Sequence, residues 1–223
     1  MSRGQQAASF PGAPGRRLMR AFFARPAATV AEDLLGKHLC IGTARVRIVE
    51  TEAYVGPHDA ASHSRTRTRR SAVMFGPPGH AYVYFVYGLH HMLNVVTGPV
   101  GSGEAVLLRA AEPVAGIAGR LDGPARLAKA LGIHRGHDGM DLCGQGAWFE
   151  DGTRPMVERG PRIGVEYAGA WADAPLRFWD AGSRHVSRPA DRPVAAGNAG
   201  GHPPSTAAGK RAGSAAPSKS PAG

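Results

Sequence analysis

The sequence predicts a single domain that contains both strands and short helices. Its 223 residues, 43% of them hydrophobic, are enough for one well-packed core but not comfortably for two. Short apolar runs rich in β-branched and aromatic residues are typical of strands. Two other segments carry the terminal signals and apolar spacing of short helices. A chain of this size with both kinds of element is expected to form one mixed domain.

The two ends of the chain differ in composition from its middle. Residues 1–17 contain Gly, Pro, Gln and Arg without apolar periodicity, and we interpret them as a flexible lead. Beyond residue 187 the chain is dominated by Pro, Ala, Gly, Ser and basic residues, with Val194 as its one large apolar residue. Such a segment buries too little surface to offset the entropy of ordering it. We therefore expect a folded domain over residues 18–187 and a disordered basic tail over residues 188–223.

The charge balance favours a polyanionic partner. The formal net charge is +10 at pH 7 and the pI is about 10.4. Basic side chains displace condensed counterions from a phosphate backbone, although ribosomal, membrane-surface and merely soluble basic proteins share this composition. Only four of the basic residues are lysines, so most of the charge is guanidinium, whose planar fork suits phosphate.

Cysteine and histidine usage gives no indication of a metal or a disulfide framework. Cys40 and Cys143 are the only cysteines, and neither has a paired metal spacing. His90 and His91 would point to opposite faces of a strand and make a poor metal pair.

No apolar run approaches the length of a membrane span, and the opening residues lack an apolar signal core. We expect a cytoplasmic protein with no membrane segment.

The first part of the domain predicts one helix followed by two strands. Thr29 and Glu32 have the spacing of a capping box, and Gly36 suits the end of the helix. Residues 38–41 and 45–54 have strand character.

The second strand carries a candidate general base. Glu52 and Tyr54 share one parity, so their side chains point to the same face. If that face lines a cleft, partial burial strengthens the carboxylate as a base toward water, and the ring offers a flat surface for a planar substrate. A Glu on the outer face of a strand is more often simply solvated. Glu50 has the same parity, and we expect Glu50→Gln to have a mild effect.

Residues 56–71 predict a basic loop. Gly, Pro, His, Asp and Ser interrupt the strand pattern there, and the loop carries Arg65, Arg67, Arg69 and Arg70. We expect these arginines to contact phosphate. The alternative is a solvated run of charge, since loop arginines need no partner.

The remaining elements complete the sheet. Three of the five tyrosines fall within residues 82–87, which with residues 89–96 predict a hairpin joined near Gly88. A further strand is expected over residues 104–110. The segment 123–132 predicts the clearest helix, with Pro in its first turn and Gly at its end, and its N-terminus could bind a phosphate. Late strands are expected over residues 162–165 and 175–178.

Taken together, these segments closely resemble the alkyladenine (3-methyladenine) DNA glycosylase family. The matching blocks, in order, are residues 50–54 (ETEAY), 61–64 (ASHS), 74–80 (MFGPPGH), 82–88 (YVYFVYG) and 107–113 (LLRAAEP). The resemblance covers about residues 18–188. It implies an α+β fold, namely a single domain with a curved, mainly antiparallel sheet, flanking helices and a β-hairpin that inserts into DNA. The pattern departs at residues 68–71, where TRRS stands in place of the usual Thr-Pro-Arg-Asn.

The family resemblance also implies a reaction. A base must leave the stacked duplex before its N-glycosidic bond can be reached, so the nucleotide is flipped out. Glu52 is then the general base, and Arg109 and the main-chain carbonyl of Ile163 help to hold the attacking water. The implied activity is a monofunctional glycosylase that acts as a monomer on double-stranded DNA with alkylated or deaminated purines, without a cofactor or metal. The preferred lesion among 3-methyladenine, 7-methylguanine, hypoxanthine and ethenoadenine stays open.

The resemblance assigns further residues to the base and to DNA. The residues implied in the base pocket are Tyr54, His63, Tyr84 and, at its rim, Asn94. The residues implied in DNA contact are the intercalating Tyr87, together with Met74 and the four loop arginines.

Two other classes of function remain open from the residues alone. A non-catalytic nucleic-acid-binding module would use the same arginines and tyrosines but release no base. A metal-dependent hydrolase could use Glu52 with His58, Asp59 and His63, and a chelator would inhibit it.

Overall fold

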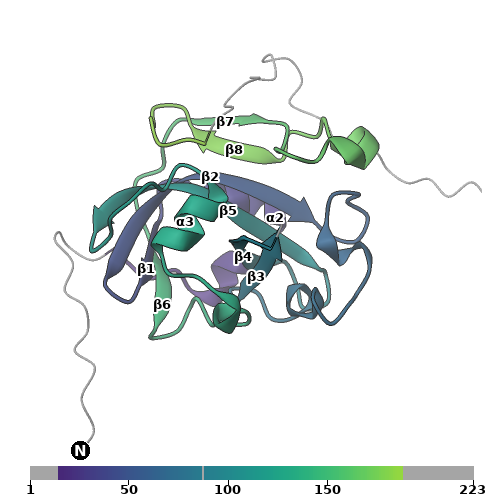
Figure 1. Ribbon diagram of the computed structural model, residues 1–223, viewed down its shortest axis with the longest axis horizontal. Helices are drawn as coiled ribbons and strands as arrows, with labels where there is room; N and C mark the ends of the chain where they lie inside the picture. Colours follow the sequence, from purple (N-terminus) through teal and green to yellow (C-terminus); the bar gives the residue numbers. More distant parts are fainter. Residues whose placement is uncertain (1–14, 87, 188–223) are drawn as a thin grey trace, which may run out of the picture.

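The computed structural model describes residues 15–86 and 88–187, which form one domain around a curled antiparallel sheet (Figure 1). The strands of this sheet are β1 (His38–Ile41), β2 (Ala44–Val55), β3 (Ala81–Val86), β4 (His90–Thr97), β5 (Glu104–Ala115), β6 (Ala147–Glu150), β7 (Val157–Gly160) and β8 (Arg177–Asp180). The α-helices are α1 (Arg20–Phe23), α2 (Ala27–Asp33) and α3 (Pro124–Ala130). Short 3₁₀ helices lie in the connections, namely η1 (His63–Arg65), η2 (Ala72–Phe75), η3 (Arg135–His137) and η4 (Glu166–Trp171).

Strand β2 is the centre of the sheet and is paired on both edges. The strands follow the order β3-β4-β5-β2-β1-β6, and β8 joins β2 while pairing with β7 (top of Figure 1). One edge of β2 runs along β5, whereas the other is shared by β1 at residues 44–47 and β8 at residues 50–52. The segment that carries Glu50 and Glu52 therefore lies between β5 and β8, which explains why both carboxylates are buried.

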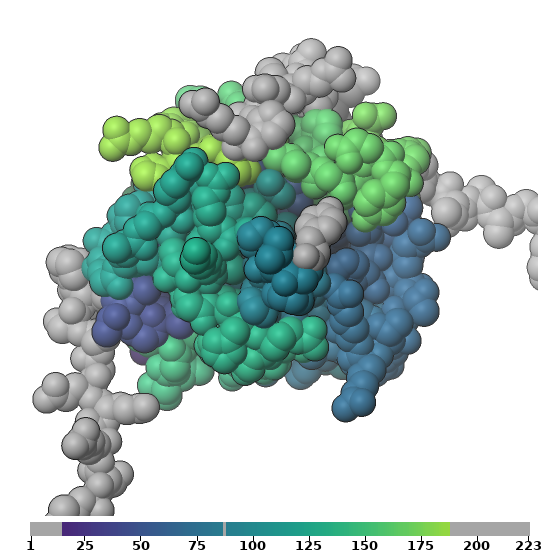
Figure 2. Space-filling model, viewed as in Figure 1, coloured from purple at the N-terminus to yellow at the C-terminus, as the bar shows by residue number. Residues whose placement is uncertain are grey.

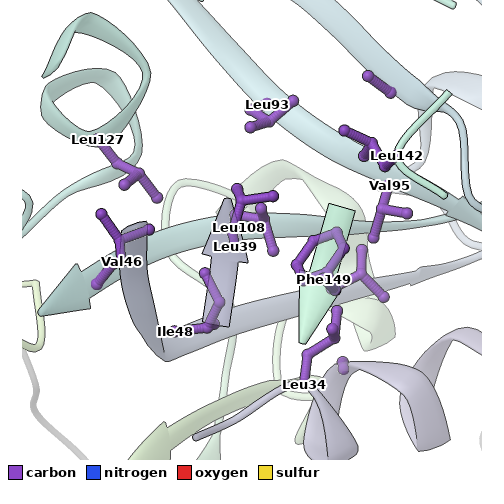
Figure 3. Packing of buried hydrophobic residues seen from close by; sticks show 14 of the residues in the cluster. Leu34, Leu39, Val46, Ile48, Leu93, Val95, Leu108, Leu127, Leu142 and Phe149 are labelled. Carbon is purple, nitrogen blue, oxygen red and sulfur yellow. The ribbon is translucent and has the colours of Figure 1, made fainter. Parts of the chain in front are cut away.

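The hydrophobic core fixes the helices onto the sheet. Leu34 at the end of α2, Leu127 of α3, Phe149 of β6 and Leu108 of β5 belong to one core cluster, and Figure 3 shows Leu34 near Phe149 and Leu127 near Val46. Helices of seven residues are unstable alone in water. Each fully buried leucine contributes roughly 1.5–3 kcal/mol, so tertiary packing rather than local propensity holds these helices.

Most of the predicted elements are present. The strands at 38–41, 45–54 and 104–110 are found, the last extended to Ala115, and β3 and β4 form the predicted hairpin. The helix predicted over 123–132 is α3, with Pro124 in its first turn.

The capping box predicted at Thr29 and Glu32 is wrong. Helix α2 begins earlier, at Ala27, and no side chain at its own N-cap position accepts a hydrogen bond. The Ala27 N–H instead donates to Oε2 of Glu104 at 2.7 Å, so a distant carboxylate satisfies the helix start.

The late strands are only partly as predicted. Residues 162–165 form a bend instead of a strand, because the Ile163 N–H donates to the Glu52 side chain rather than to a neighbouring strand. The strand expected over 175–178 begins two residues later as β8, and β6 and β7 were not predicted.

One glycine allows a loop to approach the site. Gly103 has φ +70°, and a Cβ there would lie 2.8 Å from Cβ of Ser64 and 2.9 Å from the ring of Phe75. Only glycine therefore lets β5 start this close to the turn that carries His63.

No helix in residues 15–86 and 88–187 combines the length and apolar character needed to cross a bilayer.

Candidate active site

One pocket collects every residue that the sequence assigned to catalysis or to the base. Its volume is about 270 Å³, and it lies between β2, β5, the β3-β4 hairpin and the segment that follows Arg162. The predicted residues that line it are Glu52, Tyr54, His63, Tyr84, Asn94, Arg109 and Ile163. Segments more than 100 residues apart in sequence thus meet at one site.

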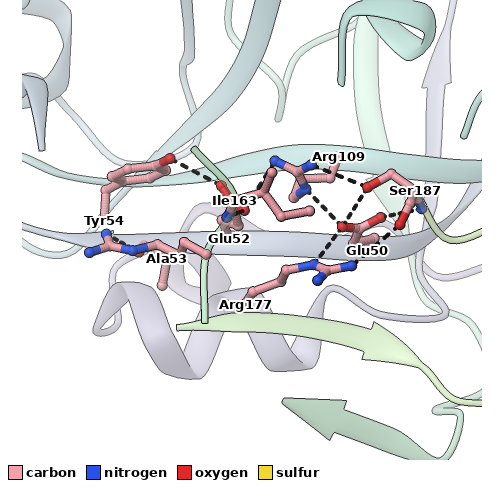
Figure 4. Close-up of polar contacts among 9 residues, drawn as sticks. Glu50, Glu52, Ala53, Tyr54, Arg109, Ile163, Arg177 and Ser187 are labelled. Atoms are coloured by element: carbon pink, nitrogen blue, oxygen red, sulfur yellow. Dashed lines mark hydrogen bonds and ion pairs between the residues drawn. The ribbon is translucent and has the colours of Figure 1, made fainter. Parts of the chain in front are cut away.

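Glu52 is held at the base of this pocket by three donors (Figure 4). Its Oε1 accepts the Ile163 N–H at 2.8 Å and pairs with Nη1 of Arg109 at 3.0 Å. Its Oε2 accepts the Tyr54 hydroxyl at 3.0 Å, which places both residues on the face predicted from their parity. The side chain is 0% exposed, so its only approach is through the pocket it lines. Because Oε2 receives one donor from the described residues, it keeps the capacity to accept another.

Arg109 reaches Glu52 from a bulge in β5. Pairing along β2 passes from Glu50 with Ala110 to Thr51 with Leu108, which leaves Arg109 out of the regular register. Bulges of this kind redirect side chains beside active sites. Burial alone would lower the pKa of Arg109, but the carboxylates of Glu52 and Glu50 outweigh it and raise the pKa. The guanidinium therefore stays charged.

Glu50 is the residue that the sequence interpreted least well. It is fully buried, and its Oε1 accepts Nε of Arg109 at 2.7 Å and Nε of Arg177 at 2.8 Å. Ser187 adds its hydroxyl to Oε1 at 2.8 Å and its N–H to Oε2 at 2.6 Å. The expectation that Glu50→Gln is mild is incompatible with a buried carboxylate that neutralises two arginines.

Tyrosines form the walls of the pocket. Burial, followed by the negative charge of Glu52, raises the pKa of both Tyr54 and Tyr84, so both stay protonated. Tyr82 also lines the pocket and was not predicted. Its hydroxyl lies 2.9 Å from Nδ1 of His63, and its own ring is 1% exposed. Tyr82 and Tyr84 have the same parity on β3 and therefore share a face, and this pattern in the sequence could have identified Tyr82 as a pocket residue.

His63 stands over this aromatic wall. Its ring meets Tyr84 edge-on with centroids 4.5 Å apart. Desolvation lowers the pKa of His63, and the positive charge of Arg70 lowers it further. The imidazole is therefore neutral at pH 7, and it presents no positive charge to a cationic base.

Behind Tyr54 lies a second buried cation that sequence reasoning missed. Arg162 forms a fully buried, bidentate ion pair with Asp59, and its guanidinium carbon lies 4.8 Å from the centre of the Tyr54 ring. Charges of opposite sign 103 residues apart leave no local pattern to find. The pair locks the loop after β2 against the bend that carries Ile163.

Asn94 and Met74 differ in how well their positions match expectation. Asn94 lines the pocket, and one N–H of its Nδ2 donates to the Tyr82 carbonyl at 3.0 Å, which leaves the second N–H and the side-chain oxygen available to a ligand. Met74 is 2% exposed, lines the pocket and packs with Tyr82 and Val96. Its expected contact with DNA stays a prediction.

The four loop arginines lie on the surface beside the pocket, where Figure 2 shows their segment in blue. Arg70 donates to the Phe85 carbonyl at 2.9 Å and so ties the loop to the hairpin. Arg67 lies over the ring of Phe75. Arg65 and Arg69 are exposed. Tyr87, expected to intercalate, lies outside the described residues, as does the tail over 188–223.

An exposed aromatic marks the opposite rim. Tyr167 of η4 is 72% exposed and lines the pocket, and Figure 2 shows its segment in green across from the loop. The segment around Tyr167, EYAGAW, consists mostly of small and apolar residues and gave no signal of a site in the sequence.

The donors proposed for a metal-dependent hydrolase are not arranged as a metal site. Within residues 15–86 and 88–187, no group of three or more His, Cys, Asp or Glu residues could hold a metal ion. Both oxygens of Asp59 are instead occupied by Arg162.

Comparison with known proteins agrees with this geometry. The family model described as Methylpurine-DNA glycosylase (MPG) matches residues 21–184. A protein of Myxococcus xanthus (strain DK1622) named "Putative 3-methyladenine DNA glycosylase" is 52% identical over 181 residues, which cover 77% of this chain and 93% of that protein. Proteins with the same name from Anaeromyxobacter dehalogenans (strain 2CP-1) and Burkholderia lata are 55% identical over 181 residues and 45% identical over 212 residues. The first alignment covers 78% of this chain and 86% of the relative, and the second covers 86% and 100%. This chain belongs to the methylpurine-DNA glycosylase family.

Proposed function

We propose that the protein is a monofunctional DNA glycosylase that removes alkylated or deaminated purines of the 3-methyladenine type. The observation that carries the proposal is a buried carboxylate, Glu52, at the base of a pocket walled by tyrosines. A flipped purine needs such a flat aromatic enclosure, and hydrolysis needs a base positioned beneath it.

Glu52 is proposed to activate the attacking water. Its Oε1 is fixed by Arg109 and Ile163, while Oε2 is free to take one more hydrogen bond beside that of Tyr54. The water oxygen bonds to the anomeric carbon as the bond from that carbon to the base nitrogen breaks. The released proton passes to Glu52, and the bonding electrons leave with the base. A further N–H of Arg109 and the carbonyl of Ile163 are proposed to orient the water.

The carboxylate has a second proposed role in the transition state. Positive charge develops on the sugar as the bond to the base weakens, and a nearby negative group stabilises it. A purine that carries a positive charge from N-alkylation leaves as a neutral base. It therefore has less need of a general acid to protonate it as the bond breaks. The neutral His63 and the protonated Tyr54 and Tyr84 are suited to this base, because none of them adds positive charge to the pocket.

Binding to double-stranded DNA is proposed to use the surface around the pocket mouth. Arg65, Arg67, Arg69 and Arg70 would meet the phosphate backbone, and Tyr87 would fill the gap left by the flipped nucleotide. We propose that the protein works as a monomer in the cytoplasm, associated with the nucleoid when bound to DNA, and needs no cofactor.

The test is incubation of purified protein with duplexes that each carry one lesion: 3-methyladenine, 7-methylguanine, hypoxanthine or ethenoadenine. We expect release of free base and an abasic site, unaffected by a chelator. Lesion binding without base release from any of the four duplexes would indicate a non-catalytic binding module instead.

Borohydride added during turnover tests whether the enzyme uses water alone. We expect no trapped protein–DNA adduct, because Lys37 is paired with Asp151 at 2.7 Å and Lys129 is exposed on α3, and neither lines the pocket. A covalent adduct would contradict the monofunctional mechanism.

A further inference from the structure

A buried cluster of polar and charged residues holds Arg109 from the side opposite Glu52. It consists of Glu50 on β2, Arg177 on β8 and Ser187, which follows β8 and ends the described part of the chain. Each of the three is 3% exposed or less, and none of them lines the pocket. Figure 4 shows the cluster to the right of Glu52, with Arg109 between the two carboxylates.

All three nitrogens of the Arg109 guanidinium are engaged. Nε donates to Glu50 at 2.7 Å, and Nη2 donates to the hydroxyl of Ser187 at 3.2 Å. Nη1 pairs with Glu52 at 3.0 Å. A guanidinium is planar, so fixing two of its nitrogens fixes the direction of the third.

We infer that Ser187, together with Glu50, is a positioning residue for the proposed hydrolysis. Ser187 bridges the cluster, because its hydroxyl accepts from Arg109 and donates to Glu50 while its N–H donates to the other Glu50 oxygen. The pair holds the guanidinium at the angle that aims Nη1 at Oε1 of Glu52. This inference rests on the proposed function for its kinetic consequence, but the geometry it assigns to Arg109 does not depend on that function.

The charge balance supports the same role. Glu50 accepts from both Arg109 and Arg177, so the positive charge beside Glu52 is shared between two carboxylates. Without this anchor the mobile Arg109 side chain would be drawn toward Glu52 alone, which would occupy the carboxylate that must accept a proton. Orienting a charged donor through a second group is how buried sites keep their geometry through a reaction.

The anchor also requires the folded domain to extend at least to Ser187. Ser187 lies 137 residues from Glu50 and 78 from Arg109 in sequence, at the start of the segment whose composition changes. The Arg177 guanidinium reaches the Ser187 carbonyl at 3.4 Å and helps to hold this end of the chain. A folded domain that stopped a few residues earlier would lose part of the support of its own active site.

The test compares Ser187→Ala with Ser187→Thr and with a matched control, Ser183→Ala. Ser183 lies in the same segment, and its hydroxyl donates to a different carboxylate, Glu112, at 2.7 Å. Glu50→Gln is avoided here because the loss of a buried charge could unfold the protein. The readouts are the single-turnover rate of base release at saturating enzyme, the Kd for an uncleavable lesion duplex, the melting temperature, and solvent exchange of the Arg109 Nε–H proton by NMR.

For Ser187→Ala we expect a fall of roughly tenfold in the single-turnover rate, the scale of one hydrogen bond to a charged group. The Kd should stay close to that of the wild type, the melting temperature should fall because Nη2 of Arg109 loses its buried acceptor, and Arg109 Nε–H exchange should accelerate. Ser187→Thr, which keeps the hydroxyl, should restore the rate, and Ser183→Ala should change none of these quantities.

Wild-type rate and wild-type Arg109 exchange in Ser187→Ala would overturn the inference. Equal losses in Ser187→Ala and Ser183→Ala, or no rescue by threonine, would also overturn it by showing a general structural effect. If the wild type released no base, the proposed function would fail, and the exchange of the Arg109 proton would still decide whether Ser187 positions it.

Discussion

Nη1 of Arg109 lies 3.0 Å from Oε1 of Glu52, and both side chains are buried. The contact joins neighbouring strands at a bulge, where the irregular register directs Arg109 to the carboxylate. One carboxylate oxygen is thereby fixed, while the other faces Tyr54 and retains room for a further hydrogen bond. Oε1 of Glu52 is held by Arg109, whereas Oε2 is the atom available to a water. Substitutions can therefore distinguish the residues that hold the carboxylate from the carboxylate that reacts.

Glu52→Gln should abolish base release while leaving lesion binding within a few-fold of the wild type. The amide keeps the shape of the side chain but loses the basicity, and general-base catalysis contributes about 10²–10⁴ in rate. Single-turnover assays and binding to an uncleavable lesion duplex measure the two effects. Glu166→Gln, at an exposed position of η4 near the pocket, is the matched control and should behave as the wild type. Retained activity in Glu52→Gln would remove Glu52 from the mechanism.

Glu50→Gln should be strongly destabilising. Breaking a buried ion pair by removing one partner leaves uncompensated charge and costs about 3–5 kcal/mol in the free energy of unfolding. Glu112→Gln is the control, because Glu112 pairs with Arg47 at a partly exposed site where such pairs contribute about 0–1 kcal/mol. Urea unfolding of both variants checks this. Similar free energies of unfolding for the two variants would mean that the buried cluster adds no stability.

Tyr87→Ala should reduce activity more on duplex than on single-stranded lesion DNA. Tyr87 lies between Val86 at the end of β3 and Gly88 at the turn of the hairpin, and its proposed role of filling the vacated stack exists only in a duplex. Base release from both substrates is compared with that of Phe85→Ala, which truncates an exposed aromatic on β3. Similar losses on the two substrates would make Tyr87 a core residue.

Arg70→Gln should raise the pKa of His63. Burial and then the charge of Arg70 hold this pKa below 6.5, so the unfolded chain binds the proton first as the pH falls. Stability therefore rises with pH across the window between the lowered folded pKa and 6.5, and removing Arg70 should narrow that window. NMR titration of the His63 ring protons measures the shift, with Arg69→Gln as control. An equal shift in both variants would point to net charge rather than to Arg70 itself.

Deleting residues 189–223 should weaken the salt dependence of binding to undamaged duplex. The deleted segment carries four basic residues, Arg192, Lys210, Arg211 and Lys219, against one acid, Asp191. Each phosphate contact contributes a slope of roughly 0.9 in log affinity against log salt, so the slope should fall by about one to three units. Single-turnover cleavage at saturating enzyme should not change, because Ser187 and the residues of the pocket are retained. The same slope for both proteins would show that the tail does not hold DNA.

The sequence by itself determined the local elements and the chemistry they carry. Strand parity placed Glu52 and Tyr54 on one face, and their side chains are in contact at 3.0 Å. The glycine at residue 88 and the alternating tyrosines predicted the β3-β4 hairpin, and Pro124 marked the start of α3. These features depend on neighbours a few residues apart, which is the range over which backbone preferences act.

Only the tertiary structure decided which charges are buried together. Parity could not distinguish Glu50 from a solvated carboxylate, because its burial depends on β8 covering the edge of β2 that β1 leaves free. The partners Asp59 and Arg162 are 103 residues apart, and Ser187 meets Glu50 across 137 residues. A buried charge needs a partner of opposite charge, but the local sequence does not specify where in the chain that partner lies. The packing of distant strands determines which residue becomes the partner.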